Sequence, residues 1–206
     1  MTDVPEKSID LSAVPAKGSA RSRTKSIAFV ALTIAIMAVC AWVTIPVGAV
    51  PITLQMFGVS FAILALRPKE CVAAVGGYLA LGALGIPVFS SMRGGLGVLM
   101  GPTGGYLIGY LLGAALAVVV LMLARKALKL DARAAGRAPL AFAVELLCCM
   151  LFVAVSYLCG WAQFMVVTGT EPVAAFLATV APFVVLDLIK VAVAVVVARA
   201  VRTAVG

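Results

Sequence analysis

The sequence predicts an all-α integral membrane protein with six transmembrane helices and both termini on the cytoplasmic side. Apolar residues make up 64% of the chain and charged residues 12%, whereas soluble domains carry roughly 45–50% and about 25%. A bilayer accepts apolar surface on this scale, and a soluble fold has no place to bury it. The apolar residues also form long runs, and nearly all basic residues lie in the short stretches between them.

Six apolar runs predict the transmembrane helices in chain order, since about 20 apolar residues cross a bilayer. The expected spans are 26–45, 53–66, 70–85, 104–124, 139–168 and 173–202. Pro46 and Pro51 end the first span, and the charged turn RPKE at 67–70 separates the second from the third. Because the second and third runs are short, five spans with a re-entrant segment is the alternative count.

The basic residues orient these helices. With the N-terminus in the cytoplasm, every Lys and Arg except Arg93 and Lys190 falls in the N-terminal tail, a cytoplasmic connection or the C-terminal end. This distribution is the one that the positive-inside rule describes. The polar residues 1–25 are expected to form a disordered cytoplasmic tail, and residues 26–203 a single transmembrane domain.

The two exceptions predict where the chemistry lies. Arg93 is the one basic residue expected on the outside, and Lys190 lies within the last span, three residues after Asp187. This spacing puts Asp187 and Lys190 on one helix face. Ionisable groups at membrane depth are costly and usually pair or bind a ligand in an interior cavity. The pair therefore indicates a polar ligand site in the outer half of the protein, with a self-satisfied pair that joins two helices as the alternative. Glu145, near the cytoplasmic end of the fifth span, is interpreted as structural.

A glycine-rich stretch, GGLGVLMGPTGGYLIGYLLG at 94–113, has the composition of a phosphate-binding loop. It lacks the lysine with which such a loop reaches nucleotide phosphates, and it lies on the outside, so a nucleotide site is excluded. Gly101, Gly105, Gly109 and Gly113 recur every four residues. This spacing predicts a smooth helix ridge that lets a neighbouring helix approach closely.

The glycines ahead of this ridge predict an anion site. Gly94, Gly95 and Gly97 lie beside Arg93, and backbone N–H groups next to a guanidinium suit a carboxylate. In the last span, Asp187 can accept hydrogen bonds from N–H groups, and Lys190 can donate to a carbonyl or an anion. The aromatic side chains expected around the site are Tyr78, Phe89, Tyr106, Trp161, Phe164 and Phe183. This pattern is typical of a site for a small amphipathic acid with an apolar middle and a urea-like or amide-like head.

Other function classes have less support. The chain has no histidine and no clustered carboxylates, so we expect no metal, no bound cofactor and no intramembrane enzyme with a nucleophile and base. The five cysteines lie in or beside apolar runs and are expected to be buried. A proton-coupled secondary transporter and a purely structural subunit are the alternatives. Because basic residues are confined to turns and ends that flank the membrane, no nucleic-acid partner is expected.

Four motifs, taken in order, carry a family resemblance: VPITLQ at 50–55, YLALGALGIPVF at 78–89, GGLGVLMGPTGGYLIGY at 94–110 and DLIK at 187–190. Over residues 26–203 the chain resembles the biotin-specific S component BioY of energy-coupling factor (ECF) transporters. FVVL stands before DLIK in place of the small motif of the family, so the conformation ahead of Asp187 stays open.

The resemblance implies a six-helix S-component bundle in a bacterial cytoplasmic membrane. Such a protein captures biotin from outside and docks on a transmembrane coupling subunit that two cytoplasmic ATPase subunits drive. It is thought to tip over in the membrane to release the vitamin inside. Ala31 and Ala35 match the Ala-x-x-x-Ala docking face of the first helix. The loop after this helix would gate the site, and its residues Thr53 and Gln55 are expected to line it.

The residue chemistry and the family resemblance together predict which residues hold each end of biotin. Asp187 and Lys190 are expected to hold the ureido head of biotin, and Arg93 with the glycine loop is expected to hold the valerate carboxylate. Tyr78 and Phe89 belong to the expected aromatic wall. An S component for another small carboxylate vitamin is the closest alternative.

Overall fold

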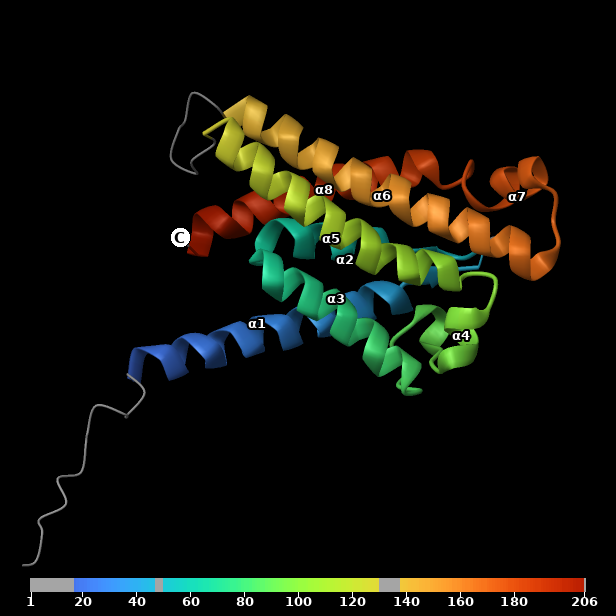
Figure 1. Ribbon diagram of the computed structural model, residues 1–206, viewed down its shortest axis with the longest axis horizontal. Helices are drawn as coiled ribbons and strands as arrows, with labels where there is room; N and C mark the ends of the chain where they lie inside the picture. Colours follow the sequence, from blue (N-terminus) through green and yellow to red (C-terminus); the bar gives the residue numbers. More distant parts are fainter. Residues whose placement is uncertain (1–16, 47–49, 130–137, 206) are drawn as a thin grey trace, which may run out of the picture.

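The structure is a computed structural model, and it describes residues 17–46, 50–129 and 138–205. Helices account for most of these residues (Figure 1). In chain order the elements are α1 (Lys17–Trp42), β1 (Thr44–Ile45), β2 (Ile52–Thr53), α2 (Gln55–Ala65), α3 (Pro68–Ala83), the 3-10 turn η2 (Ser90–Met92), α4 (Leu96–Met100), α5 (Gly104–Ala127), α6 (Ala138–Thr168), α7 (Pro172–Thr179) and α8 (Val184–Val205). The two strands pair antiparallel, with Thr44 opposite Thr53.

The long helices pack side by side as a bundle made of three helix pairs. α5 and α6 form an antiparallel pair on one side, α1 packs on α3 on the other side, and α2 lies between them against α8 (Figure 1). The start of α1, the end of α8 and the described ends of the α5–α6 connection lie at one end of the bundle, which we call the terminal end (Figure 1). α4 and α7 lie at the opposite end, which we call the mouth.

Within the described residues, three helices are long and apolar enough to cross a membrane: α1 over Arg23–Trp42, α5 and α6. α7 and α8 add a fourth span if the bent pair is counted as one. α2 is apolar but shorter, with 11 residues. The predicted class, an α-helical integral membrane protein, agrees with this architecture, and the count of six spans stays a prediction.

The first helix begins earlier than the sequence suggested. α1 begins at Lys17, so residues 17–25 of the expected tail are helical, and residues 1–16 lie outside the described residues. No proline follows Pro15 until Pro46, and proline is the residue that most strongly interrupts a helix. The helix therefore continues from its apolar span into the polar residues 17–25.

Glycines bring α5 and α6 into close contact. A Cβ atom on Gly105, Gly109 or Gly113 would collide with the backbone of α6. At Gly109 it would lie 2.7 Å from the Cα atom of Ser156. Ala117 continues the row and is fully buried. The packing ridge predicted from the four-residue spacing is confirmed along α5.

The ridge starts later than predicted. Gly101 was expected to belong to it, but this residue ends α4 in an extended conformation. Pro102 follows it, and a proline pushes the preceding residue away from helical backbone. On the facing helix, Gly160 leaves the space that the ring of Tyr106 fills. The first turn of α5 therefore also packs directly against α6.

The last span is broken, although the sequence predicted one helix over 173–202. α7 ends at Thr179 and α8 begins at Val184, and the two helices are bent by 46°. Pro182 lies in the break, where it has no N–H to donate and its ring opposes a continuous helix. As a result α8 starts just before Asp187, which lies in its first turn.

At the terminal end, one buried carboxylate joins three helices. Glu145 on α6 is only 4% exposed and forms ion pairs with Arg125 of α5 at 2.9 Å and with Arg202 of α8 at 2.7 Å. Arg199 of α8 lies 3.6 Å from its second oxygen. The structural role predicted for Glu145 agrees with these contacts.

Gly109→Ala tests the close packing of α5 and α6. The added methyl group would push against the backbone at Ser156, and overpacking of this kind costs about 1–3 kcal/mol. We expect a lower melting temperature in detergent than for the unmodified protein. Gly97→Ala is the matched control, because a Cβ atom there meets nothing within 4 Å. Equal melting temperatures for the two variants would contradict the packing described here.

Candidate functional site

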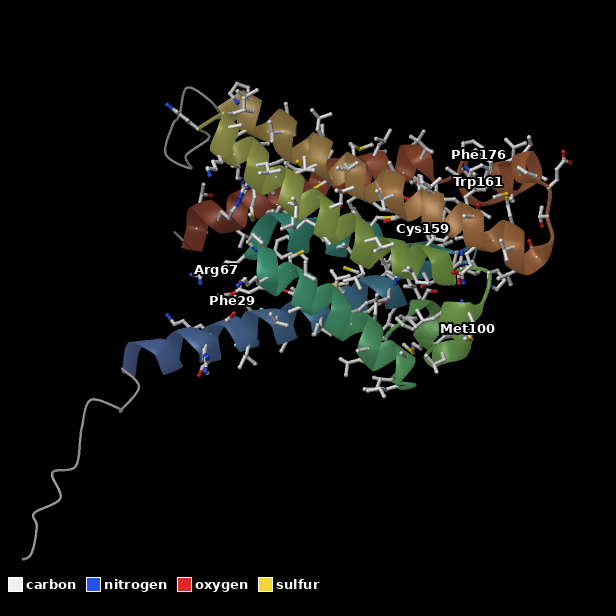
Figure 2. The ribbon with its side chains drawn as sticks, in the orientation of Figure 1. Phe29, Arg67, Met100, Cys159, Trp161 and Phe176 are labelled. Carbon is white, nitrogen blue, oxygen red and sulfur yellow. The ribbon has the colours of Figure 1, made fainter. Side chains whose placement is uncertain are left out.

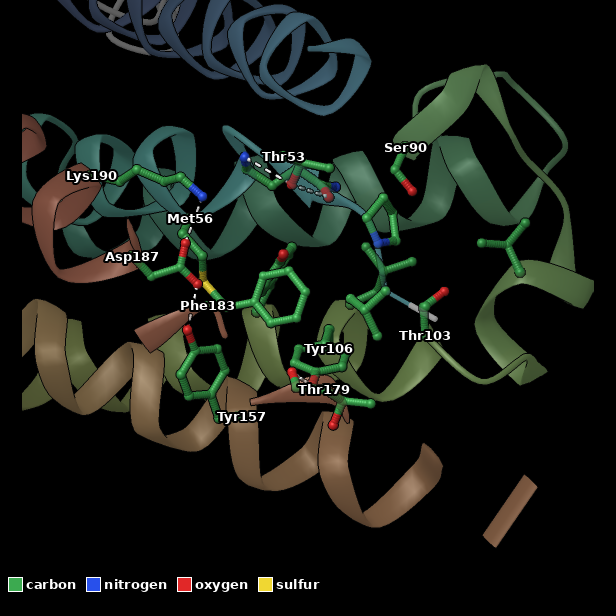
Figure 3. A pocket seen from close by; sticks show the side chains of 16 residues that line it. Thr53, Met56, Ser90, Thr103, Tyr106, Tyr157, Thr179, Phe183, Asp187 and Lys190 are labelled. Carbon is green, nitrogen blue, oxygen red and sulfur yellow. Dashed lines mark hydrogen bonds and ion pairs between the residues drawn. The ribbon is translucent and has the colours of Figure 1, made fainter. Parts of the chain in front are cut away.

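A cavity of about 50 Å³ lies among α2, α5, α6 and α8 (Figure 3). It is small beside the roughly 300–1,000 Å³ of pockets that enclose drug-sized ligands, so its walls stand close together. Its polar lining residues are Thr53, Gln55, Ser90, Thr103, Tyr106, Tyr110, Tyr157, Thr179, Asp187 and Lys190. Figure 3 shows Asp187 and Lys190 at one end of the site and Ser90 and Thr103 at the other, with Phe183 and Tyr106 between them.

The charged end of the cavity is a chain of three side chains. Lys190 Nζ donates to Asp187 Oδ1 at 2.7 Å, and the hydroxyl of Tyr157 donates to Asp187 Oδ2 at 2.6 Å. Asp187 is 4% exposed. The position of its carboxylate in the first turn of α8 adds the favourable field of a helix N-terminus. The pairing predicted from the i, i+3 spacing is confirmed, and Tyr157 is a partner that the sequence analysis did not find.

The break between α7 and α8 supplies a second fixed contact. The N–H of Phe183 bonds to Val180, so the carbonyl of Thr179 lacks the partner that a continuous helix would give it. The hydroxyl of Tyr106 donates to this carbonyl at 2.6 Å. Tyr106 thereby attaches α5 to the end of α7, and both residues line the cavity.

The β1–β2 hairpin and the start of α2 form another wall. Thr53 donates to Gln55 Oε1 at 3.1 Å, and Gln55 Nε2 donates to the hydroxyl of Tyr78 at 2.8 Å. Tyr78 in turn donates to the carbonyl of Val88. Thr53 and Gln55 line the cavity as expected, while Tyr78 and Phe89 support it from behind. Their rings pack edge to face with centroids 5.5 Å apart.

Arg93 does not line the cavity. Its side chain is exposed, and Nε donates to the carbonyl of Ser90 at 3.3 Å. Ser90 itself does line the cavity. The predicted ligand contact of Arg93 therefore stays a prediction, and its side chain touches the lining residue Ser90 at the backbone carbonyl.

The three glycines after Arg93 shape this loop and do not line the cavity. A Cβ atom on Gly94 would press on the carbonyl of Ile86. Gly95 has φ +97°, a conformation that favours glycine, and its N–H bonds to the carbonyl of Gly82 at 2.6 Å. Gly97 lies inside α4. Their predicted role in holding an anion has no counterpart among the residues that line the cavity.

A glutamine that the sequence analysis missed holds α4 in place. Gln163 on α6 donates to the carbonyls of Leu99 and Gly101 at 2.7 and 2.8 Å. These carbonyls lie at the end of α4, next to the lining residues Val98 and Thr103. Lone glutamines on apolar helices carry no sequence signal for such a contact.

Several predicted aromatic residues have other roles. Tyr106 and Phe183 line the cavity, and Phe164 is buried elsewhere. Trp161 packs edge to face on Phe176 of α7, with centroids 6.3 Å apart (Figure 2). In the part of the chain that the structure describes, no group of three or more His, Cys, Asp or Glu side chains could hold a metal ion.

The predicted docking residues lie on the surface of α1. Ala31 and Ala35 are exposed, as is Ala28 one turn earlier. Phe29 on the same helix is 50% exposed. This leaves small side chains available to a neighbouring helix, which is the condition for close helix contact in a membrane.

The fold and the site define a multi-pass α-helical membrane protein with an internal cavity that polar and charged side chains line. The family model described as the BioY family matches residues 12–206. The chain belongs to the BioY family.

Relatives and a solved structure agree with this assignment. The chain is 35% identical over 177 residues to the probable biotin transporter BioY of Pyrococcus horikoshii, covering 86% of this chain and 96% of that protein. It is 36% identical over 180 residues to the biotin transporter BioY of Rhodobacter capsulatus, covering 83% and 87%. The biotin transporter BioY of Thermotoga maritima is 51% identical over 80 residues, 39% of this chain and 47% of that protein.

The solved structure is the crystal structure of the S-component for biotin from an ECF-type ABC transporter. It matches with a TM-score of 0.77 and 27% identity, covering 93% of this chain and 95% of that chain. The predicted S-component-like fold is confirmed.

Lys190→Met tests the buried pair. The substitution leaves the carboxylate of Asp187 buried without its cation, which we expect to cost about 3–5 kcal/mol of folding free energy. Thermal melting in detergent measures the loss. The double variant with Asp187→Asn removes both charges and should regain most of the stability. A single variant that melts like the unmodified protein would show that the pair is not buried in the folded state.

Proposed function

We propose that this chain is the substrate-capture subunit for biotin uptake and that it binds the vitamin in the cavity between Asp187 and Ser90. The observation that carries the proposal is the cavity itself, which has a charged pair at one end, hydroxyl groups at the other and apolar side chains between them. Biotin has the matching sequence of a ureido head, an apolar middle and a carboxylate. Membership of the BioY family and the names of the relatives support the choice of ligand.

The charged end fits the ureido head. An ionised carboxylate has about four acceptor positions, and the contacts from Lys190 and Tyr157 occupy one on each oxygen of Asp187. The remaining positions can accept the N–H groups of a ureido ring. An ammonium group has three donors, so Lys190 can also donate to the ureido carbonyl.

The opposite end fits the carboxylate. Ser90 and Thr103 line the cavity there, and the exposed side chain of Arg93 donates to the carbonyl of Ser90. A rotation of this side chain towards the cavity would pair the guanidinium with the valerate. The glycines after Arg93 then serve to shape the loop that carries it.

Energy for uptake must come from partner subunits, since the chain contains no ATP-binding motif. The exposed alanines of α1 fit a transmembrane coupling subunit, which two cytoplasmic ATPase subunits would drive. The charge distribution supports a cytoplasmic N-terminus and a mouth that faces outward. The cytoplasmic membrane of a bacterium is the location that the family resemblance implies. An intramembrane enzyme finds no support in the family assignment.

Biotin titration of the purified protein tests the function. We expect saturable one-to-one binding by calorimetry or by the fluorescence of Trp42 and Trp161. Arg93→Ala should weaken binding about 10- to 100-fold, the value of a hydrogen bond to a charged group, with normal folding. Lys69→Ala, which removes an exposed charge at the terminal end, is the control. Folded protein without biotin binding would refute the assignment and direct the search to other vitamin carboxylates. Unchanged binding by Arg93→Ala would refute only the carboxylate contact.

Substitution of Ala31 and Ala35 by leucine tests the docking face. The larger side chains should prevent close helix contact, so the coupling and ATPase subunits should no longer co-purify with the variant while biotin binding persists. Ala154→Leu, at an exposed alanine of α6, is the matched control. Co-purification of the α1 variant at the level of this control would place the docking surface elsewhere.

A further inference from the structure

The tyrosines of this chain gather at one place. The chain has four, Tyr78, Tyr106, Tyr110 and Tyr157. Three of them line the cavity, and Tyr78 is one hydrogen bond behind its wall through Gln55. Tyrosine hydroxyls both donate and accept hydrogen bonds, so this concentration marks the cavity as the polar centre of an otherwise apolar bundle.

Three of the four hydroxyls have fixed protein acceptors. Tyr78 donates to the carbonyl of Val88, Tyr106 to the carbonyl of Thr179, and Tyr157 to the carboxylate of Asp187. These three hydrogen bonds hold the walls of the site in position. The hydroxyls of the three tyrosines therefore already have partners when no ligand is bound.

Tyr110 differs from the other three. Its side chain lines the cavity and is only 5% exposed, and its hydroxyl, which stays accessible from the cavity, forms no hydrogen bond within residues 17–46, 50–129 and 138–205. Its ring packs on Phe152 with centroids 5.8 Å apart, which fixes the direction of the ring. A hydroxyl that faces a cavity without a protein partner is available to water or to a ligand, because it can both donate and accept a hydrogen bond.

The other unpaired polar groups have different settings. Ser60 and one oxygen of Glu145 are buried without a hydrogen bond, but neither residue lines the cavity. Ser90 and Thr103 line the cavity but are half-buried, so water can reach them. Tyr110 combines a largely buried ring, a place in the cavity wall and a hydroxyl that stays accessible from the cavity.

The position of Tyr110 along α5 indicates which part of a ligand it meets. Thr103 precedes α5 at the mouth, and Tyr110 lies one helical turn, about 6 Å, beyond Tyr106 towards the terminal end. Asp187 and Lys190 lie in the first two turns of α8, which runs from the break after α7 towards the terminal end. Tyr110 therefore lies away from Ser90 and Arg93 and on the side of the charged pair.

We propose that the hydroxyl of Tyr110 is a further ligand contact, which hydrogen-bonds the polar head of the bound acid at the charged end of the cavity. This inference rests on the proposed function, because it takes biotin as the ligand and its ureido group as the head. The ligand supplies the partner that the protein lacks, so the contact adds to affinity without adding to the stability of the free protein.

Tyr110→Phe tests the proposal, because it removes the hydroxyl and keeps the ring. We expect biotin affinity to fall about tenfold, the value of one neutral hydrogen bond. The melting temperature of the ligand-free variant should equal or exceed that of the unmodified protein, since no protein contact is lost. Tyr106→Phe is the comparison. It leaves the carbonyl of Thr179 without its donor and should lower the melting temperature.

Biotin amide, which lacks the carboxylate charge, locates the contact. Tyr110→Phe should lose the same factor for biotin and for its amide if the hydroxyl meets the head. A loss that disappears with the amide would place Tyr110 at the carboxylate and overturn the assignment to the head. Unmodified protein that binds biotin while Tyr110→Phe binds it within twofold would overturn the proposal alone. Unmodified, folded protein that binds no biotin would overturn the proposed function together with it.

Discussion

The cavity depends on the break between α7 and α8. In a bilayer every backbone polar group needs a partner within the protein, and Pro182 removes one donor from the last span. The break at this point leaves the carbonyl of Thr179 for Tyr106 and starts α8 ahead of Asp187. The break around this proline thus places the buried carboxylate in the first turn of α8 and leaves a backbone carbonyl for the hydroxyl of Tyr106.

The short distance between α5 and α6 is the second requirement. The glycine row lets the two backbones meet, and Gly160 admits the ring of Tyr106 between them. Tyr106 from α5 and Tyr157 from α6 then pack edge to face, with centroids 6.3 Å apart, beside the cavity. A stretch with the composition of a phosphate loop therefore contributes packing, and the polar chemistry comes from the side chains that this packing brings together.

Sequence reasoning recovered the features that carry a strong local signal. Membrane class follows from composition, the Asp187–Lys190 pair from spacing, and the α5 ridge from the glycine period. Tyr110 and Tyr157 were missed because a tyrosine on an apolar helix looks like any core aromatic until the opposing helix is known. The glycines beside Arg93 were given a ligand role because a sequence does not show which backbone N–H groups are already bonded. In the fold, the N–H of Gly95 donates to the carbonyl of Gly82.

The two ends of the bundle are held by different kinds of force. At the terminal end, Glu145 ties α5, α6 and α8 together through arginines at 2.7 to 3.6 Å. At the mouth, Trp42, Tyr106 and Gln163 hold the neighbouring segments through neutral hydrogen bonds to backbone carbonyls. Neutral hydrogen bonds are weaker than charge-assisted ones and can be exchanged singly for bonds to water. The contacts at the mouth therefore cost less to break one at a time than the ion pairs that join the helices at the terminal end.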